Sequence, residues 1–331
     1  ELAFKVDSIS AVCLFKGSVD LPNNVRVYSL GKEEKLGRWA YLKNFFRYIW
    51  ILRKDYDVVF VHMNPEYVIL GGLIWRLLGK KIILWYAHYL ANWRIRLAEW
   101  LANSVVASTA RAFPFPSKKL EVLQQGINTK LFNPVRVYRG SDDSIKILFL
   151  GRIAPIKNLD VLIKAIQLAG QRLPIKLSVV GAPTAGNTAD SEYLISVKKM
   201  VADFGLSGSA SFLSPVPNKN TPPIYRRHDL FINLTVTGSF DKSTLEAMAC
   251  GVPILVSNLA FADIIPSDLQ AKLMFKEGDY RDLADKIVGF SRISKEERKE
   301  IGSRLRDIIV KHHDLSGLLN KLVKVFRAYD H

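Results

Sequence analysis

The stretch KILFLGRIAPIKNL, residues 146–159, predicts one strand, one loop and the start of one helix. Its apolar run at 146–150 is typical of a buried strand. Gly151 allows a tight exit from this strand, and Asn158 is a suitable cap for a helix that begins at Leu159. This order of elements is the repeating unit of a parallel sheet that is covered by helices.

The same alternation of short apolar runs and helical periodicity continues on both sides of this stretch. It predicts parallel sheets with helices on both faces, and therefore an α/β fold. The further runs that we interpret as buried strands are residues 11–15, 57–62, 81–86, 104–108, 176–180, 210–213, 230–234 and 253–256.

A seam without apolar periodicity divides this pattern at residues 132–143. It contains Asn133-Pro134 and Gly140 followed by polar residues, which is typical of turns and linkers. We therefore expect a first domain over residues 1–135 and a second domain over residues 136–314. Residues 315–331 hold a basic amphipathic helix.

Composition restricts the class of protein. The chain of 331 residues is 49% hydrophobic, enough for two sizeable cores. The formal net charge of +16 favours anionic partners, namely nucleic acid, anionic lipid or phosphorylated sugars. No recognised nucleic-acid motif accompanies this charge, so we expect no nucleic-acid partner.

The two cysteines, Cys13 and Cys250, form no disulfide framework and favour a reducing compartment. No apolar run is long enough to span a bilayer.

The loop at 151–158 carries two cations, Arg152 and Lys157, in front of the predicted helix. A capped helix N-terminus beside two cations suits a diphosphate, because arginine can fork onto phosphate oxygens and lysine adds a point charge. An exposed basic loop without a ligand is the alternative that the spacing leaves open.

A second motif, SFDKSTLEAMACGVP, occupies residues 239–253. Gly251 ends the short helix that begins near Ser243, and the next strand follows. Ser243 and Glu246 have the spacing of a capping box, which is a purely structural explanation for Glu246. The functional alternative makes Glu246 an acceptor for sugar hydroxyls, with backbone N–H groups at 242–244 meeting phosphate.

The two motifs, in this order and with the turn QGIN at 125–128 before the linker, resemble those of glycosyltransferase family four. That family has the GT-B fold, in which two Rossmann-like doubly wound domains face a cleft and the C-terminal helix crosses back to the first domain. The resemblance implies a retaining enzyme whose second domain binds a nucleotide-sugar donor and whose first domain binds the acceptor.

The resemblance also implies roles for individual residues. Arg152 and Lys157, after Gly151, would bind the donor diphosphate, and Glu246 would contact the nucleotide ribose. The remaining residues of the predicted donor site are Pro215 and Val216, whose backbone would lie near a uracil or guanine base, and Asp241, Lys242, Ser243 and Thr244.

His88 follows the predicted strand at 81–86, and family members often place there a histidine that touches the donor sugar. A satisfied, partly buried histidine is the alternative, and His62 is a second candidate at another strand end. We assign His88, Arg152 and Lys157 to catalysis, because the two cations can offset the charge of the leaving diphosphate. No Asp-x-Asp pair lies at a convincing strand end, so we expect neither a metal nor a cofactor.

Two features depart from the family pattern. The family commonly has Glu-x7-Glu, and its first Glu helps to hold the donor sugar, whereas this chain has Gly238 at that position. Asp241 is our candidate to take over part of this role. The chain begins with Glu1-Leu2-Ala3, which resembles the end of the family's first helix, so we expect that the first strand and its loop are missing.

Residues 37–54 combine five basic residues and six aromatic residues with no acidic one. On a helical wheel Lys43, Arg47, Trp50 and Lys54 form one stripe, which suits an anionic lipid surface. A helix packed on the sheet with a solvated basic face is the alternative.

These observations predict a metal-independent retaining glycosyltransferase that uses a UDP or GDP sugar. It would move a hexose-type sugar to a glycan or lipid-linked acceptor, in the cytoplasm and peripherally on the inner face of an anionic membrane. The alternatives are a nucleotide-sugar epimerase, which Gly238 disfavours, and a non-catalytic sugar-nucleotide or membrane-binding protein, which Gly238 favours.

Overall fold

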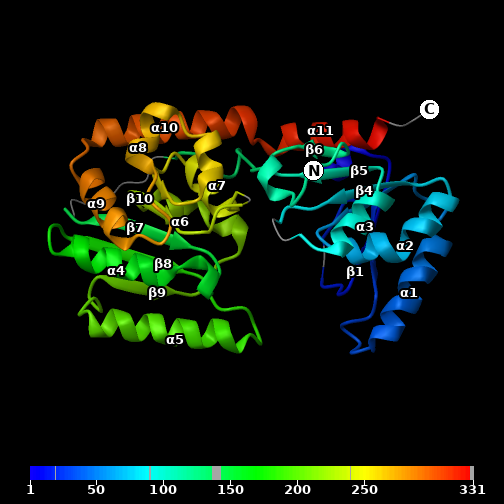
Figure 1. Ribbon diagram of the computed structural model, residues 1–331, viewed down its shortest axis with the longest axis horizontal. Coiled ribbons are helices and arrows are strands. Elements are labelled where there is room, and N and C mark those ends of the chain that lie inside the picture. Colours follow the sequence, from blue (N-terminus) through cyan, green and yellow to red (C-terminus); the bar gives the residue numbers. More distant parts are fainter. Residues whose placement is uncertain (19, 89–90, 136–142, 239, 329–331) are drawn as a thin grey trace. The chain divides into compact units, whose positions relative to one another are not determined.

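The computed structural model describes the chain except for residues 19, 89–90, 136–142, 239 and 329–331 (Figure 1). The chain forms two compact units. Unit 1 comprises Glu1–Gln124 and the segment from Ser316 onward, and unit 2 comprises Gln125–Leu315. Most of the predicted linker lies outside the described residues.

Unit 2 is built on a five-stranded sheet with the order β11-β10-β7-β8-β9. All neighbouring strands in it are parallel. The strands are β7 (Ile145–Leu150), β8 (Ile175–Val180), β9 (Ala210–Leu213), β10 (Leu230–Asn233) and β11 (Ile254–Val256).

Side chains alternate between the two faces of this sheet along each strand, so each strand contributes to a core on either face. Helices cover both faces and complete these two cores. Ile147 and Phe149 of β7 belong to a core that contains residues of α4 (Leu159–Gly170), α5 (Thr188–Asp203) and α9 (Tyr280–Ser291). Leu148, between them, belongs to a second core with α7, α8 and α10. The remaining helices of unit 2 are η3 (Pro155–Lys157), η4 (Asn218–Asn220), α6 (Pro222–Arg226), α7 (Lys242–Ala249), η5 (Leu259–Asp263), α8 (Ser267–Leu273) and α10 (Lys295–His312).

Unit 1 holds a four-stranded parallel sheet with the order β3-β4-β5-β6 and a separate parallel pair, β1-β2. Its strands are β1 (Ile9–Cys13), β2 (Val25–Ser29), β3 (Val58–His62), β4 (Lys81–Trp85), β5 (Ser104–Ala107) and β6 (Leu120–Val122). Its helices are η1 (Leu2–Lys5), α1 (Arg38–Ile51), α2 (Pro65–Leu77), α3 (Trp93–Leu101), η2 (Ala110–Ala112) and α11 (Leu315–Arg327).

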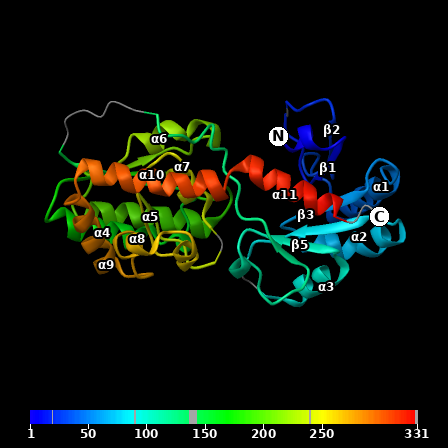
Figure 2. The same ribbon diagram turned by 90° about the horizontal axis from the view of Figure 1, so that it is seen from above.

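The four-stranded sheet of unit 1 lies between two helical layers (Figure 2). Ile82 and Leu84 of β4 share a core with buried residues of α1, α2 and α3. Ile83 and Trp85, which point to the opposite face, share another core with two residues of α11, Leu322 and Val325. The C-terminal helix therefore packs on the first unit.

The structure confirms the predicted α/β fold with parallel sheets in two Rossmann-like domains. Every run that we interpreted as a buried strand overlaps a strand, and the ends differ by at most two residues. The sequence did not indicate β2 or β6. The first unit ends at Gln124 rather than at residue 135, because the segment after it packs on unit 2. Ile127 pairs there with Asp314, and Phe132 is 2% exposed in the core.

Among the described residues, no helix is both long enough and apolar enough to cross a bilayer.

Candidate functional site

The candidate site lies in unit 2, where the strand order reverses. From β7 the chain continues to β8 and β9 on one side, and it later returns to β10 on the other side of β7. The loops that follow β7 and β10 therefore leave neighbouring strands at the carboxyl edge of the sheet. Ligands of open parallel sheets bind at such switch points.

Two glycines fix the start of the loop after β7. Gly181 has φ +149°, and a Cβ atom placed on it would lie 1.9 Å from the carbonyl oxygen of Gly151. The N–H of Gly151 donates to Val180 O at 3.0 Å, and the N–H of Ile153 donates to Ala182 O at 3.0 Å. The loop that carries Arg152 is thus held against the loop after β8. Gly151 lies in the predicted loop, whereas no motif in the sequence marks Gly181.

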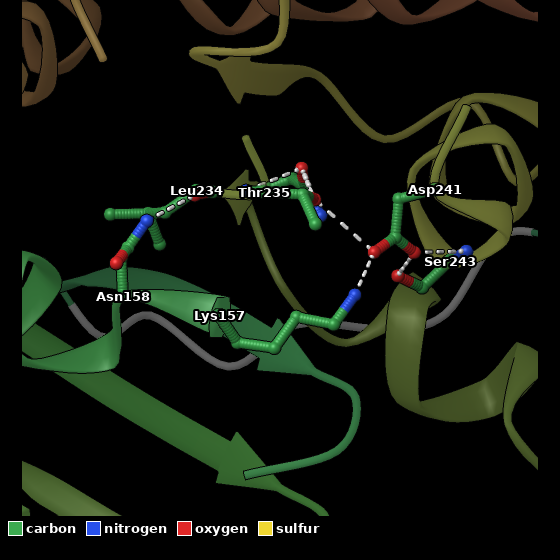
Figure 3. Close-up of polar contacts among 7 residues, drawn as sticks. Lys157, Asn158, Leu234, Thr235, Asp241 and Ser243 are labelled. Atoms are coloured by element: carbon green, nitrogen blue, oxygen red, sulfur yellow. Dashed lines mark hydrogen bonds and ion pairs between the residues drawn. The ribbon is translucent and has the colours of Figure 1, made fainter. Parts of the chain in front are cut away.

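Lys157 and Asp241 form an ion pair between the two loops (Figure 3). Their side chains are 20% and 12% exposed. The carboxylate of Asp241 also accepts hydrogen bonds from the backbone N–H of Ser243 at 3.1 Å, the Ser243 hydroxyl at 2.6 Å and the Thr235 hydroxyl at 3.2 Å. Burial alone would raise the pKa of Asp241. The Lys157 ammonium and the Ser243 donors outweigh burial, so this pKa lies below its usual value.

Asn158 does not cap α4 with its side chain, contrary to our prediction. Its backbone is left-handed, with φ 50° and ψ 38°, whereas a capping residue has extended dihedrals. Its amide Nδ2 instead donates to the carbonyl of Leu234 at 3.1 Å, which is a second tie between the loops after β7 and β10 (Figure 3).

The cap of α7 is Asp241 rather than Ser243, so the predicted capping box is also wrong. The helix begins at Lys242, whereas Ser243 as the cap would require a start at residue 244, so the capping position moves two residues back to Asp241. A capping box therefore does not explain the presence of Glu246 at this position.

Glu246 is 2% exposed and holds two hydrogen bonds. Its Oε1 accepts from the amide of Asn218 at 2.8 Å, and its Oε2 accepts from the hydroxyl of Tyr225 at 3.0 Å. The ammonium of Lys242 lies 3.8 Å from Oε1. Burial raises the pKa of Glu246 despite these donors. Neither Asn218 nor Tyr225 lies in a motif, so the sequence did not indicate these contacts.

The other predicted donor-site residues differ in exposure. Arg152 and Pro215 are exposed, and Val216 is half-buried against the core that contains α7. Thr244 is fully buried, and its hydroxyl has no hydrogen-bond partner among the residues that the structure describes. Gly238, where the family commonly has Glu, is buried.

The candidate histidines belong to unit 1. His88 follows β4, is half-buried, and its ring centroid lies 6.5 Å from that of Tyr86. His62 ends β3 and stacks on Trp85 with a centroid distance of 6.0 Å, and burial lowers its pKa. Nowhere in the described part of the chain do three His, Cys, Asp or Glu side chains form a set that could hold a metal ion.

The predicted membrane stripe lies on α1, where Lys43, Arg47 and Trp50 are exposed, and Lys54 after the helix is exposed too. The guanidinium of Arg53 lies 4.3 Å from the centroid of the Trp50 ring. Phe45 and Ile49 on the opposite side of the helix are buried in the core of unit 1. The helix is thus packed on the sheet and also presents a basic, aromatic face.

Comparisons with known proteins relate this architecture to one group of enzymes. Residues 144–292 match the family profile described as "Glycosyl transferases group 1". A D-inositol 3-phosphate glycosyltransferase from Mycobacteroides abscessus is 25% identical over 194 residues. The matched part covers 54% of this chain and 42% of that protein, so the chain spans less than half the length of this curated relative.

Two solved structures have a similar fold. Anabaena Alr3699/HepE in complex with UDP has a TM-score of 0.74 at 16% identity, with coverage of 92% of this chain and 86% of that chain. Sucrose-phosphate synthase from Thermosynechococcus elongatus has a TM-score of 0.75 at 14% identity, with coverage of 94% and 84%. The fold of the protein is therefore that of GT-B glycosyltransferases.

Proposed function

We propose that the protein is a retaining glycosyltransferase, which moves a hexose-type sugar from a nucleotide diphosphate to a glycan or lipid-linked acceptor at a membrane surface. The observation that carries this proposal is the contact of Lys157 with the capping residue of α7, Asp241, at the switch point of unit 2, on the same loop that carries Arg152. The family match over residues 144–292 supports the assignment of this unit to glycosyl transfer.

The donor is proposed to bind in unit 2 through its diphosphate and ribose. Cationic side chains and helix N–H groups suit the diphosphate, and the buried carboxylate of Glu246 suits ribose hydroxyls. Pro215 and Val216 are proposed to lie near the base. UDP is the first nucleotide to test, because the similar Anabaena protein was crystallised with UDP and with UDP-glucose.

Sugar transfer with retention of anomeric configuration and without a metal is proposed to rely on the cationic side chains of the donor site. Arg152 and Lys157 would offset the negative charge that develops on the leaving diphosphate, which is the largest electrostatic demand of the reaction. The leaving phosphate oxygen would accept the proton of the acceptor hydroxyl, so the mechanism needs no protein nucleophile. The role of His88 at the donor sugar stays a prediction.

Thermal unfolding of the full chain with UDP, GDP, ADP and their hexose conjugates tests the donor site. A ligand at 100 times its dissociation constant adds about 2.7 kcal/mol of stability. We expect a shift with one base only, and its loss in Arg152→Gln and in Glu246→Gln. Lys199→Gln, which removes an exposed charge on α5, is the control that should keep the shift. The absence of any shift, both in the folded wild type and in a folded Asp241→Asn variant that releases Lys157 from its ion pair, would refute the donor site.

An assay for release of the nucleoside diphosphate in the presence of acceptors then distinguishes an enzyme from a protein that only binds the donor. The non-catalytic alternative is favoured by one observation, the glycine at position 238 where the family commonly has Glu. Nucleotide binding without sugar transfer to any glycan or lipid-linked acceptor would support that alternative.

We also propose that unit 1 contacts an anionic membrane through the outer faces of α1, α2 and α3. These helices pack on one face of the same sheet. Their exposed side chains include Trp39, Trp50, Leu73, Leu77, Trp93 and Trp100, and α1 also exposes Lys43 and Arg47. Aromatic and apolar side chains next to cations are typical of helices that lie at lipid interfaces.

Sedimentation with phosphatidylcholine vesicles, with and without phosphatidylserine, tests this surface. Each basic residue near an anionic bilayer contributes about 1 kcal/mol, so Lys43→Gln with Arg47→Gln should weaken binding roughly thirtyfold. Lys198→Gln with Lys199→Gln removes the same charge from exposed positions of α5 and is the matched control. Equal losses in the two double variants would contradict the assigned surface.

A further inference from the structure

The ion pair of Lys157 and Asp241 occupies the place where the proposed site needs a free cation. The pair joins the end of η3, after β7, to the capping position of α7, after β10. The two residues are 84 positions apart in the sequence. Their opposite charges cancel, so Lys157 presents no net charge to a phosphate while the pair is intact.

Both oxygens of the Asp241 carboxylate already accept hydrogen bonds or ion-pair contacts within the protein. One oxygen accepts from the backbone N–H and the hydroxyl of Ser243, and the other accepts from Lys157 and Thr235 (Figure 3). A backbone N–H at a helix N-terminus, a hydroxyl and an ammonium are also the donors that a phosphate would use. Asp241 thus holds the position and the partners of a bound anion.

We propose that Asp241 is an internal anion that competes with the donor diphosphate for Lys157 and thereby sets the affinity of the site. Binding then requires Lys157 to exchange the Asp241 carboxylate for a phosphate oxygen. The diphosphate also approaches a fixed negative charge, which opposes binding. The consequence is weak retention of the nucleoside diphosphate, both in the donor and in the leaving product. This inference rests on the proposed donor site.

Asp241→Asn is the informative substitution. Asparagine has nearly the same shape and is as good a helix cap as aspartate, so Ser243 keeps its acceptor. The negative charge disappears and the Lys157 ammonium is released. We expect the dissociation constant of UDP, or of the nucleotide that the wild type prefers, to fall about tenfold, which corresponds to 1.4 kcal/mol.

The background Lys157→Gln shows whether the effect passes through the ion pair. With no ammonium to release, only the direct repulsion between Asp241 and the diphosphate remains, so Asp241→Asn should lower the dissociation constant by about threefold or less. The difference between the two backgrounds is the coupling through the ion pair. Calorimetric titration of the full chain with UDP, GDP and ADP measures all four proteins. Circular dichroism confirms that each is folded.

The outcomes separate this inference from the proposed function. Tighter binding by Asp241→Asn, or binding by that variant alone, supports the inference. Equal or weaker binding by Asp241→Asn overturns it while the donor site stands. An undiminished gain in the Lys157→Gln background overturns competition for Lys157. No nucleotide binding by either the folded wild type or folded Asp241→Asn overturns the donor site and the inference together.

Discussion

Replacing Gly181 by alanine should damage the loop that carries Arg152. The added Cβ would lie 1.9 Å from the carbonyl oxygen of Gly151 and 3.0 Å from its carbonyl carbon. Both are backbone atoms, so no side-chain rotation relieves the overlap. The N–H of Gly181 also donates to Leu213 O at 3.2 Å, which ties the residue to the end of β9.

Two costs add up at this position. A residue with a Cβ atom at positive φ costs about 1–2 kcal/mol. Forcing an extra carbon into packed structure costs about 1–3 kcal/mol more. We therefore expect Gly181→Ala to lower the free energy of unfolding of unit 2 by about 2–5 kcal/mol in total. Gly186, in the same loop, has φ +75° and nothing within 4 Å of its Cβ position, so Gly186→Ala carries the first cost alone.

Thermal unfolding of both variants measures the difference. In a unit of this size, 1 kcal/mol corresponds to a shift of about 2–4 °C in the unfolding midpoint. Nucleotide titration adds a functional readout, since a displaced Gly151 moves Arg152 and should weaken binding only in Gly181→Ala. If Gly181→Ala were as stable as Gly186→Ala, the close approach of the two loops would not exist in solution.

Two pH-dependent predictions concern the carboxylates of unit 2 and have opposite signs. Asp241 has a lowered pKa, so its ion pair stabilises the fold above the usual aspartate pKa and is lost as the pH falls through the lowered value. Asp241→Asn should therefore destabilise unit 2 by about 1–2 kcal/mol at pH 7, and urea titrations should show this difference vanishing in acid. Glu246 has a pKa raised by burial, so its contribution is complete below the usual glutamate pKa and falls as the pH rises through the raised value. The stability of wild type relative to Glu246→Gln should decrease over that rise, and a constant difference would count against the burial of a charged Glu246.

The sequence was sufficient to predict the central strands because they are buried on both faces. The run at 146–150, for example, lacks the alternation of apolar and polar residues that marks a half-exposed strand. β6 has only three residues and lies at the edge of its sheet, so it is too short for a periodic signal. Within the described part of the chain β2 pairs with β1 alone, and its exposed Arg26 breaks the apolar pattern.

The members of the site could be predicted, but their contacts could not. Lys157 and Asp241 each lie in a motif, yet their pairing depends on β7 being the neighbour of β10. That neighbourhood is set by the order of strands in the sheet, which spacing along the chain does not encode. The same holds for the contacts that Asn218 and Tyr225 make with Glu246.

The two helix caps were mispredicted because capping depends on backbone dihedrals as well as on residue type. Asn158 has a suitable side chain but a left-handed backbone, and Ser243 is the second residue of α7, two positions beyond the cap. The cap that forms, Asp241, turns its carboxylate towards Lys157 instead of leaving it free for a sugar.

This geometry bears on the missing glutamate at position 238. A carboxylate three residues later sits at the helix cap, where Ser243, Thr235 and Lys157 hold it inside the protein. The contacts of Asp241 therefore favour pairing with Lys157 over the sugar-holding role that we predicted for Asp241. Lys157 is kept in place in the absence of ligand, and this preorganisation comes at the expense of affinity. One substitution, Asp241→Asn, should accordingly lower stability and raise nucleotide affinity. A residue that served only the fold would give the first effect without the second, and a direct ligand of the donor would lose affinity.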